Sequence, residues 1–189
     1  IDIPNVSFNQ FELDVLIENN NFIVNSLTLK DKETILETSG SMNLDNSLDR
    51  SFNLKLSNFK KSEILNFYPQ LSETINLIPG NVINFEGFLA GSDLEITNFI
   101  ILKENQPILI IAGDIDLQNL NETFLNVKVD NMTSSDVEVL LTNFEQGKYK
   151  NYLDIYNYDK ITGNIFFDFK NENIVIDKID AHLGNEKIG

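Results

Sequence analysis

Two stretches of the chain carry the same alternation of apolar and polar residues. Residues 25–44 (NSLTLKDKETILETSGSMNL) match residues 98–117 (NFIILKENQPILIIAGDIDL) without a gap, at a constant offset of 73 residues. Both copies carry a glycine at the same place, Gly40 and Gly113, and the match continues from residues 52–64 onto residues 125–137. One offset held over this length indicates an internal repeat.

The alternation has a period of two residues, which predicts β-strands with one apolar and one polar face. In each copy we expect three successive strands, the first two separated by a short charged turn. On one face of the first strand we place Ile23, Asn25, Leu27 and Leu29, and on its copy Ile96, Asn98, Ile100 and Leu102. The same face of the second and third strands carries Leu36, Thr38, Gly40, Met42, Leu44, Phe52, Leu54 and Leu56, with the copies Leu109, Ile111, Gly113, Ile115, Leu117, Leu125, Val127 and Val129.

After the third strand the apolar period lengthens, which predicts a short amphipathic helix in each copy. In the second copy, Ser135 and Glu138 have the spacing of a capping box. In the first copy, Pro69 limits the length of the helix. The apolar helix positions are Ile64, Phe67, Tyr68 and Leu71, and in the copy Val137, Leu140, Leu141 and Phe144.

Two more strands follow each helix, at residues 82–91 and 94–99 and again at 159–170 and 174–179, with Gly87 opposite Gly163. The predicted fold is therefore all-β with short amphipathic helices, an elongated repeat structure of units of about 73 residues. We divide the chain into the end of a preceding repeat (1–21), unit 1 (22–94), unit 2 (95–173) and the start of a third unit (174–189). Because the last unit stops early, we expect the chain to be a fragment of a longer protein.

The composition narrows the classes of partner. The formal net charge of −15 argues against nucleic acid, whose binding depends on Lys and Arg. The chain has no Cys, which excludes disulfides and thiolate metal sites. The longest apolar run, ILIIA at 108–112, is far shorter than the roughly 20 residues of a spanning helix.

No catalytic constellation emerges from the sequence. His182 is the only histidine, and its neighbours form no metal-ligand pattern. Gly87 and Gly91 do not form a nucleotide-binding glycine loop, and the acidic cluster at Asp168, Asn171 and Glu172 lacks the spacing of an EF-hand. We expect no catalytic residue, no metal, no cofactor and no enzymatic activity.

The order of several segments resembles the TamB/AsmA-like family, particularly the TamB-like members of Bacteroidetes-type bacteria. The segments are the pair Tyr68-Pro69 after a short helix, Gly87 and Gly91 in G-x-x-x-G spacing, LEITNF (94–99), IIAGDIDL (110–117), KVDNMTSSDVEVLL (128–141) and GNIFFDF…IDAHLG (163–184). The resemblance covers residues 40–189 and, through the repeat, reaches back to about residue 22.

The resemblance implies a curved β-sheet, a taco-like trough with an apolar interior, in a protein that spans the periplasm. It implies transport of phospholipid between the inner and outer membranes, assembly of outer-membrane proteins, or both. The inner-membrane anchor and the part that meets an outer-membrane barrel assembly protein are expected outside this chain. The expected groove residues, which contact phospholipid acyl chains, are Leu27, Leu29, Met42, Leu44, Leu54, Leu56, Ile100, Leu102, Ile115, Leu117, Val127 and Val129.

A second interpretation stays open at this point, because apolar alternation is also typical of a closed core. In that case the chain is a closed β-repeat module that binds a glycan or a protein, as an adhesin does. Four tyrosines within KYKNYLDIYNYDK then offer a recognition surface. They are Tyr149, Tyr152, Tyr156 and Tyr158.

Overall fold

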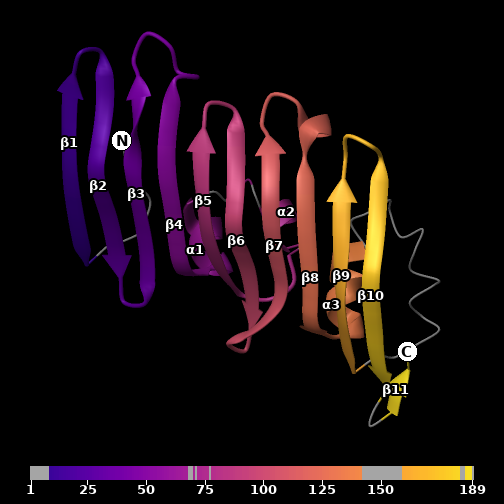
Figure 1. Ribbon diagram of the computed structural model, residues 1–189. Coiled ribbons are helices and arrows are strands. Elements are labelled where there is room, and N and C mark those ends of the chain that lie inside the picture. Colours follow the sequence, from indigo (N-terminus) through magenta and orange to yellow (C-terminus); the bar gives the residue numbers. More distant parts are fainter. Residues whose placement is uncertain are drawn as a thin grey trace.

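The computed structural model describes residues 9–67, 70, 72–76, 78–141, 159–183 and 186–188. The strands are β1 (Gln10–Glu18), β2 (Asn21–Asp31), β3 (Thr34–Asn43), β4 (Arg50–Lys60), β5 (Val82–Ala90), β6 (Asp93–Lys103), β7 (Gln106–Asp116), β8 (Phe124–Met132), β9 (Lys160–Asp168), β10 (Asn173–Leu183) and β11 (Glu186–Ile188) (Figure 1). The helices are α1 (Lys61–Phe67), α2 (Ser72–Asn76), α3 (Ser134–Leu141) and the 3-10 helix η2 (Leu120–Glu122).

All the described strands belong to one sheet of eleven strands. The strand order in the sheet is the order in the sequence, so each strand is hydrogen-bonded to the strands that precede and follow it in the chain. The pairs are antiparallel, so the chain winds back and forth from β1 to β11 (Figure 1). Among the described residues the sheet does not close on itself, because β1 pairs only with β2 and the other end of the strand order is β10–β11. The predicted all-β fold is confirmed, and the sheet is open.

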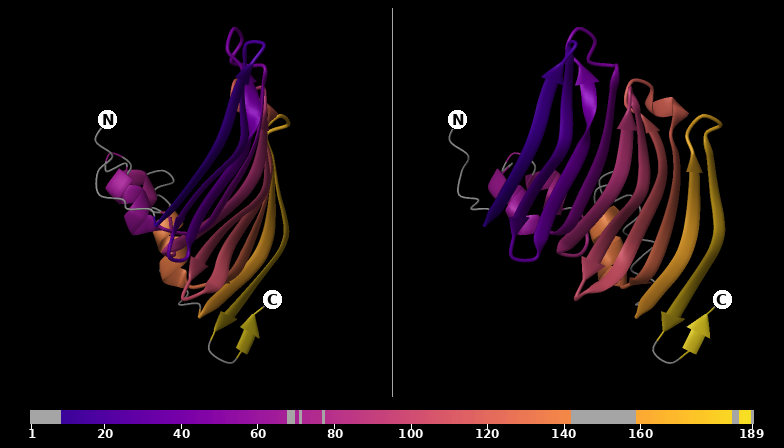
Figure 2. Two further views of the ribbon diagram at one scale, coloured as in Figure 1. Left: turned by 90° about the vertical axis from the view of Figure 1, so that its left-hand side faces the viewer. Right: turned by 60° about the vertical axis from the view of Figure 1, so that its left-hand side comes forward.

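The sheet is curved, and the helices lie on its concave side. Figure 2 shows the strands bowing away from the helices, which gather near one end of the strands. α1 and α2 connect β4 to β5, and α3 follows β8. Both helical connections therefore leave the sheet at the same end, where the strands also turn at residues 32–33 and 104–105. We call this the helix end of the trough.

The buried core lies between the concave face and these helices. Ile101, Ile108, Leu109 and Met132 form a buried cluster, and Val137 of α3 and Ile78, which follows α2, pack against it. Met132 and Ile101 are only 1% and 2% exposed. The helices thus cover the part of the concave face near their own end.

The two predicted short helices are present, although α3 begins differently from the sequence prediction. Its N-terminal capping box is formed by Thr133 and Asp136, not by Ser135 and Glu138: the Thr133 amide donates to Asp136 Oδ2 at 3.0 Å. Lys103 Nζ also donates to Asp136, at 2.6 Å. In the first copy Glu63 takes the same place and accepts from the Lys60 amide at 3.0 Å. The apolar helix positions Tyr68, Leu71 and Phe144 lie outside the described residues.

The strand pairing corrects the repeat alignment for the first strand of the unit. Leu27 of β2 pairs with Thr38, and Phe99 of β6 pairs with Ile111. Thr38 and Ile111 are 73 residues apart, whereas Leu27 and Phe99 are 72 apart. The extra residue is Ile108, where the register of β6 with β7 shifts. Leu27 therefore corresponds to Phe99 and not to Ile100.

The glycine pair at the end of the unit also differs from the predicted match. Leu54 pairs with Gly87, but its copy Val127 pairs with Ile165. Gly163 pairs with Val129 instead, two residues further along the strand. Gly87 and Gly163 are therefore not equivalent positions. The unit boundaries drawn from the sequence remain a prediction.

Candidate functional site

The concave face of the sheet is almost entirely apolar. Residues directly opposite each other in antiparallel strands project to the same face, so the pairing assigns each side chain to a face. The polar members of the described concave face are Thr38 in the middle of β3, Arg50 at the start of β4 and, at the helix end of the strands, Asp31, Thr34, Lys103 and Gln106. The apolar and glycine members, from β1 to β10, are Phe11, Leu13, Val15, Ile17, Phe22, Val24, Leu27, Leu29, Leu36, Gly40, Met42, Phe52, Leu54, Leu56, Phe59, Ile83, Phe85, Gly87, Leu89, Leu94, Ile96, Phe99, Ile101, Leu109, Ile111, Gly113, Ile115, Leu125, Val127, Val129, Met132, Ile161, Gly163, Ile165, Phe167, Ile174, Ile176, Ile179 and Ala181.

Bulges keep this face apolar along the whole sheet. In β2, β6 and β10 the alternation is interrupted at Asn25–Ser26, at Thr97–Asn98 and at Asp177. Each bulge adds a residue to one strand only, which returns the next apolar side chain to the concave face. β4 and β8 carry bulges as well, at residues 57–58 and 130–131, so the correction recurs along the sheet.

Cover over the apolar face decreases away from the helices. Ile83, Ile101 and Leu109, near the helix end, are buried. Leu54, Leu94 and Ile115, further from the helices, are only half-buried. At the two sides of the sheet the apolar row is open: Ile17 of β1 is 66% exposed and Ile174 of β10 is 65% exposed. The described chain therefore forms an apolar trough that is covered at one rim, largely half-buried along its middle, where Val24 and Ile96 are buried, and most exposed at its two sides.

The structure places eight of the twelve predicted groove residues on the concave face: Leu27, Leu29, Met42, Leu54, Leu56, Ile115, Val127 and Val129. Ile100 and Leu102 are corrections. Ile100 pairs with Asn84 and Ile110, and Leu102 pairs with Val82, all on the opposite, convex face. The bulge at Thr97–Asn98 reverses the alternation, so the side chains that point into the trough are Phe99 and Ile101.

Leu44 and Leu117 are also corrections, because both follow the last residue of a strand. The Asn43 side chain accepts the amide of Asp45 at 2.9 Å, and Asp116 accepts the amide of Gln118 at 2.8 Å. These side-chain turns end the strands one residue before each leucine. Leu44 and Leu117 are 52% and 49% exposed, and they lie at the rim of the trough and not inside it.

The sequence prediction missed the contributions of β1, β5, β9 and β10 to the trough. In β1, Phe11, Leu13 and Val15 alternate with acidic residues in the segment QFELDVLIE, and this alternation was the signal available. In β5 the signal was weaker, because Phe85 and Phe88 point to opposite faces of the same strand.

The rim opposite the helices is made by hairpin loops that are hydrogen-bonded to one another. The loops are residues 19–20, 44–49, 91–92, 117–123 and 169–172, and we call them together the loop rim. Leu44 N donates to Asn20 O at 2.7 Å, Leu117 N to Ser92 O at 2.9 Å, and Phe169 N to Thr123 O at 3.1 Å. These bonds join loop 19–20 to loop 44–49, and they join loops 91–92, 117–123 and 169–172 into a second group.

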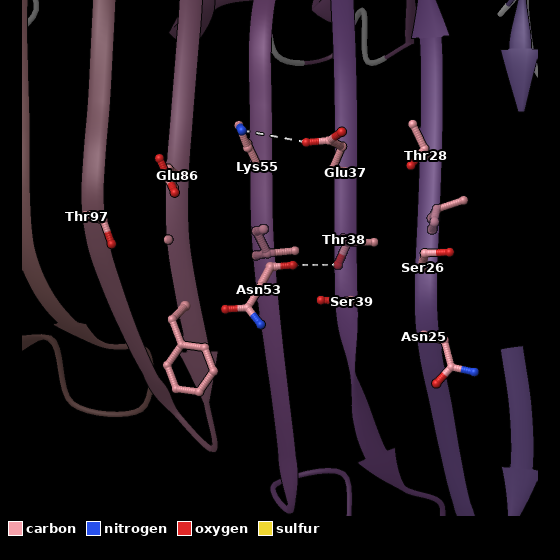
Figure 3. Close-up of a pocket in the computed structure, with 14 residues that line it drawn as sticks. Asn25, Ser26, Thr28, Glu37, Thr38, Ser39, Asn53, Lys55, Glu86 and Thr97 are labelled. Atoms are coloured by element: carbon pink, nitrogen blue, oxygen red, sulfur yellow. Dashed lines mark hydrogen bonds and ion pairs between the residues drawn. The ribbon is translucent and has the colours of Figure 1, made fainter. Parts of the chain in front are cut away.

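The convex face differs in chemistry. A hollow of about 520 Å³ lies on this face, over β2 to β6. Ser26, Ser39 and Asn53 are among its lining residues (Figure 3). Lys55 and Glu37 form an ion pair across it at 3.7 Å. Its hydroxyl, amide and charged groups suit water and polar ligands, so this hollow is not a second apolar trough. Further along, the convex face carries the apolar residues Val82, Ile100, Leu102 and Ile110.

The tyrosines and the histidine singled out in the sequence do not contribute to the described trough. All four tyrosines of the predicted recognition surface lie outside the described residues. His182 lies in β10, opposite Lys160. Within the described part of the chain, no three His, Cys, Asp or Glu residues gather as a group that could hold a metal ion. None of the described helices is long and apolar enough to cross a bilayer.

Comparison with protein-family models, with curated proteins and with solved structures gives no match for this chain.

Proposed function

We propose that this chain is a segment of a TamB-like envelope protein, and that its concave face is a hydrophobic groove for phospholipid acyl chains. In the proposal the segment lies in the periplasm, within a protein anchored in the inner membrane. It takes part in phospholipid transport between the two membranes, in outer-membrane protein assembly through an outer-membrane barrel partner, or in both. The parts that anchor it and meet the partner belong to other regions of that protein.

The observation that carries the proposal is the apolar lining that runs from β1 to β10 on an open, concave face and is interrupted by Thr38 of β3. A closed core would bury these residues, yet the rows in β1 and β10 are about half exposed or more, as for Phe11 at 61% and Ile176 at 58%. Large exposed apolar surfaces mark ligand grooves and interaction sites. An acyl chain is an occupant that such a lining suits, since each methylene removed from water contributes about 0.8 kcal/mol.

The dimensions also suit acyl chains. Neighbouring strands are about 4.8 Å apart, so the spacings between β1 and β11 add up to roughly 50 Å along the trough. The acyl chains of one leaflet span roughly 15 Å, half of a hydrocarbon core of about 30 Å. The described trough is thus long enough to hold more than one lipid in succession. Because the lining is mostly apolar, an acyl chain that moves along the trough replaces apolar contacts with other apolar contacts.

The test compares two double variants that differ only in the face they alter. Leu54→Gln/Leu94→Gln places amides on the concave face, and Lys55→Gln/Glu95→Gln alters the adjacent convex residues without changing the net charge. Each protein is incubated with palmitoyl-oleoyl phosphatidylethanolamine, and bound lipid is counted by native mass spectrometry. We expect lipid on the parent chain and on the convex variant, and at least fivefold less on the concave variant.

Circular dichroism and thermal melting establish that both variants are folded. Absence of lipid from the parent chain would refute the proposal. Equal lipid on the two folded variants would also refute it, because the binding would then not involve the concave face.

A further inference from the structure

β1 lies at one side of the sheet, and among the described residues no strand pairs with its outer edge (Figure 1). All 9 residues of β1 are exposed, although apolar and polar residues alternate in it as they do in the inner strands. Phe11 and Ile17 on its concave face are 61% and 66% exposed. An edge of this kind presents backbone N–H and C=O groups that another strand can bind.

β1 occupies the same place in the repeat as β5 and β9. Each of these strands is paired with the strand that follows it, β2, β6 or β10, and in each pair that second strand has a bulge at the same place. The residue just before the bulge is Asp14 in β1, Glu86 in β5 and Asn164 in β9. These three residues hold equivalent positions, so β5 and β9 indicate which strand the outer edge of β1 accepts.

β4 and β8 are the strands that pair with β5 and β9 on their other side. Lys55 of β4 lies directly opposite Glu86, and Lys128 of β8 lies directly opposite Asn164. The strand beside this edge thus has a lysine at one convex position, and its concave face is apolar in both copies. The concave residues are Phe52, Leu54, Leu56 and Phe59 in β4 and Leu125, Val127, Val129 and Met132 in β8.

A strand with this pattern also fits the outer edge of β1. In the same register its lysine lies opposite Asp14, which is exposed on the convex face. Lys55 forms an ion pair with Glu37 of β3 at 3.7 Å, so a lysine at this position reaches a carboxylate on a neighbouring strand. Directly opposed residues of opposite charge stabilise an antiparallel pair. The apolar residues of the strand then lie opposite Ile17, Val15, Leu13 and Phe11.

We propose that the outer edge of β1 binds one further strand of the β4 type, supplied by another repeat of the kind described here. The strand pairs antiparallel to β1, with its apolar residues on the concave face and a lysine opposite Asp14. It buries the exposed apolar row of β1 and extends the apolar lining of the trough by one strand. Strand binding at this edge does not require that the trough binds lipid.

A second copy of β1 suits this edge less well. Two β1 strands that pair antiparallel, with their apolar residues on the same side, place Glu12, Asp14 and Glu18 of both copies on one convex face. Like charges opposite each other destabilise a strand pair. The charge of β1 therefore favours a partner strand that carries lysine.

The experiment uses the full chain and a fluorescein-labelled peptide with the β4 sequence, RSFNLKLSNFK (residues 50–60). Fluorescence anisotropy measures binding. We expect this β4 peptide to bind, and a scrambled peptide, in which apolar and polar residues no longer alternate, not to bind. Lys55→Glu in the peptide should weaken binding on the order of fivefold, because a like-charge pair then replaces an opposite-charge pair.

Two protein variants test the contact with Asp14. Asp14→Lys and Asp114→Lys change the net charge equally, and both residues are exposed on the convex face, but Asp114 lies in β7, which is paired on both sides. We expect Asp14→Lys to bind the Lys55→Glu peptide more tightly than the β4 peptide. Asp114→Lys should keep the preference of the parent chain, and circular dichroism establishes that both variants are folded.

A disulfide tests the register, because the chain has no cysteine of its own. Leu13→Cys in the chain would lie opposite Leu56→Cys in the peptide, whereas Ser51→Cys in the peptide would lie opposite Glu18. The Cα atoms of a disulfide lie within about 7 Å of each other. Only the Leu56→Cys peptide should therefore cross-link to the Leu13→Cys chain.

The outcomes separate the occupants of the edge. Absence of binding by the β4 peptide, or equal binding of the scrambled peptide, would overturn the docking site. Equal peptide preferences of Asp14→Lys and Asp114→Lys, or cross-linking of both cysteine peptides, would overturn the register. Cross-linking of the Leu13→Cys chain to itself would assign the edge to a second copy instead. The lipid measurement tests the groove separately, so failure of one proposal is distinguishable from failure of the other.

Discussion

At the scale of single residues, two glycines explain why the repeat keeps the same residue at the same place. Gly40 and Gly113 are separated by the repeat offset, and both have a positive φ, 152° and 145°. A Cβ on Gly113 would lie 2.0 Å from the Phe124 carbonyl oxygen, and one on Gly40 equally close to that of Ser51. The neighbouring strand approaches too closely for any side chain.

We therefore expect Gly113→Ala to destabilise the chain by more than about 3 kcal/mol, because both the backbone conformation and the contact oppose a Cβ. Urea unfolding monitored by circular dichroism measures the change. Gly91→Asn is the matched control: Gly91 has a φ of 60°, which asparagine tolerates, and its nearest Cβ contact is 3.4 Å. A loss under about 1 kcal/mol for Gly113→Ala would show that the strands separate easily at this point.

At the scale of secondary-structure elements, each copy ties the start of its helix to the sheet through one acidic residue. Asp136 is buried, and it accepts hydrogen bonds from Thr133 and from Lys103 of β6. Burial raises the pKa of Asp136, but the hydrogen bonds from Lys103 and Thr133 outweigh it, so the pKa lies below its ordinary value. The helix is thus held over the concave face by an ionised carboxylate.

The lowered pKa makes this contribution depend on pH. A carboxylate whose pKa is lower in the folded state stabilises the fold above its unfolded pKa of about 3.9, and the contribution is lost as the pH falls through the folded pKa. We expect Asp136→Asn to lower the free energy of unfolding by about 1–2 kcal/mol at pH 7, as loss of a helix cap does. The difference from the parent chain should shrink below about pH 4.

Urea unfolding at pH 7, 5 and 3.5 tests the expectation. Asp114→Asn serves as the control, because Asp114 is exposed on the convex face and should have little effect at any pH. A difference between Asp136→Asn and the parent chain that stays constant down to pH 3.5 would contradict the assignment.

Among the secondary-structure elements, the sequence predicted the strands and the two short helices, but it did not predict which side chains of β6 face the trough. The strands and the two short helices followed from hydrophobic period, because period 2 and period 3.6 are distinct when apolar and polar residues alternate. In β6 four apolar residues follow one another, Phe99 to Leu102, and such a run does not say which of them face the trough. The single extra residue Ile108 of β7 moved the alignment by one position, and the bulge at Thr97–Asn98 leaves Ile96 on the concave face but places Ile100 and Leu102 on the convex face.

At the scale of the whole molecule, the sheet has a protected middle and two open sides. The buried cluster of Ile101, Ile108, Leu109 and Met132 lies in β6, β7 and β8, next to the helices. β1 pairs on one side only, and β10 is paired on its outer side only at residues 181–183 among those described. An open trough of this kind depends on its centre for stability and leaves the sides free for other contacts.

We expect amide hydrogen exchange to follow this order. Opening free energies are largest where backbone hydrogen bonds are covered by packed apolar side chains and smallest at exposed edges. The amides of β7 and β8 should exchange slowest, and those of β1 and of residues 173–180 fastest, when exchange is measured by mass spectrometry or NMR at low protein concentration. Protection of β1 as strong as that of β7 would show that its edge is covered. If that protection decreases on dilution, the cover is a second copy of the chain, and the trough is then longer than one molecule.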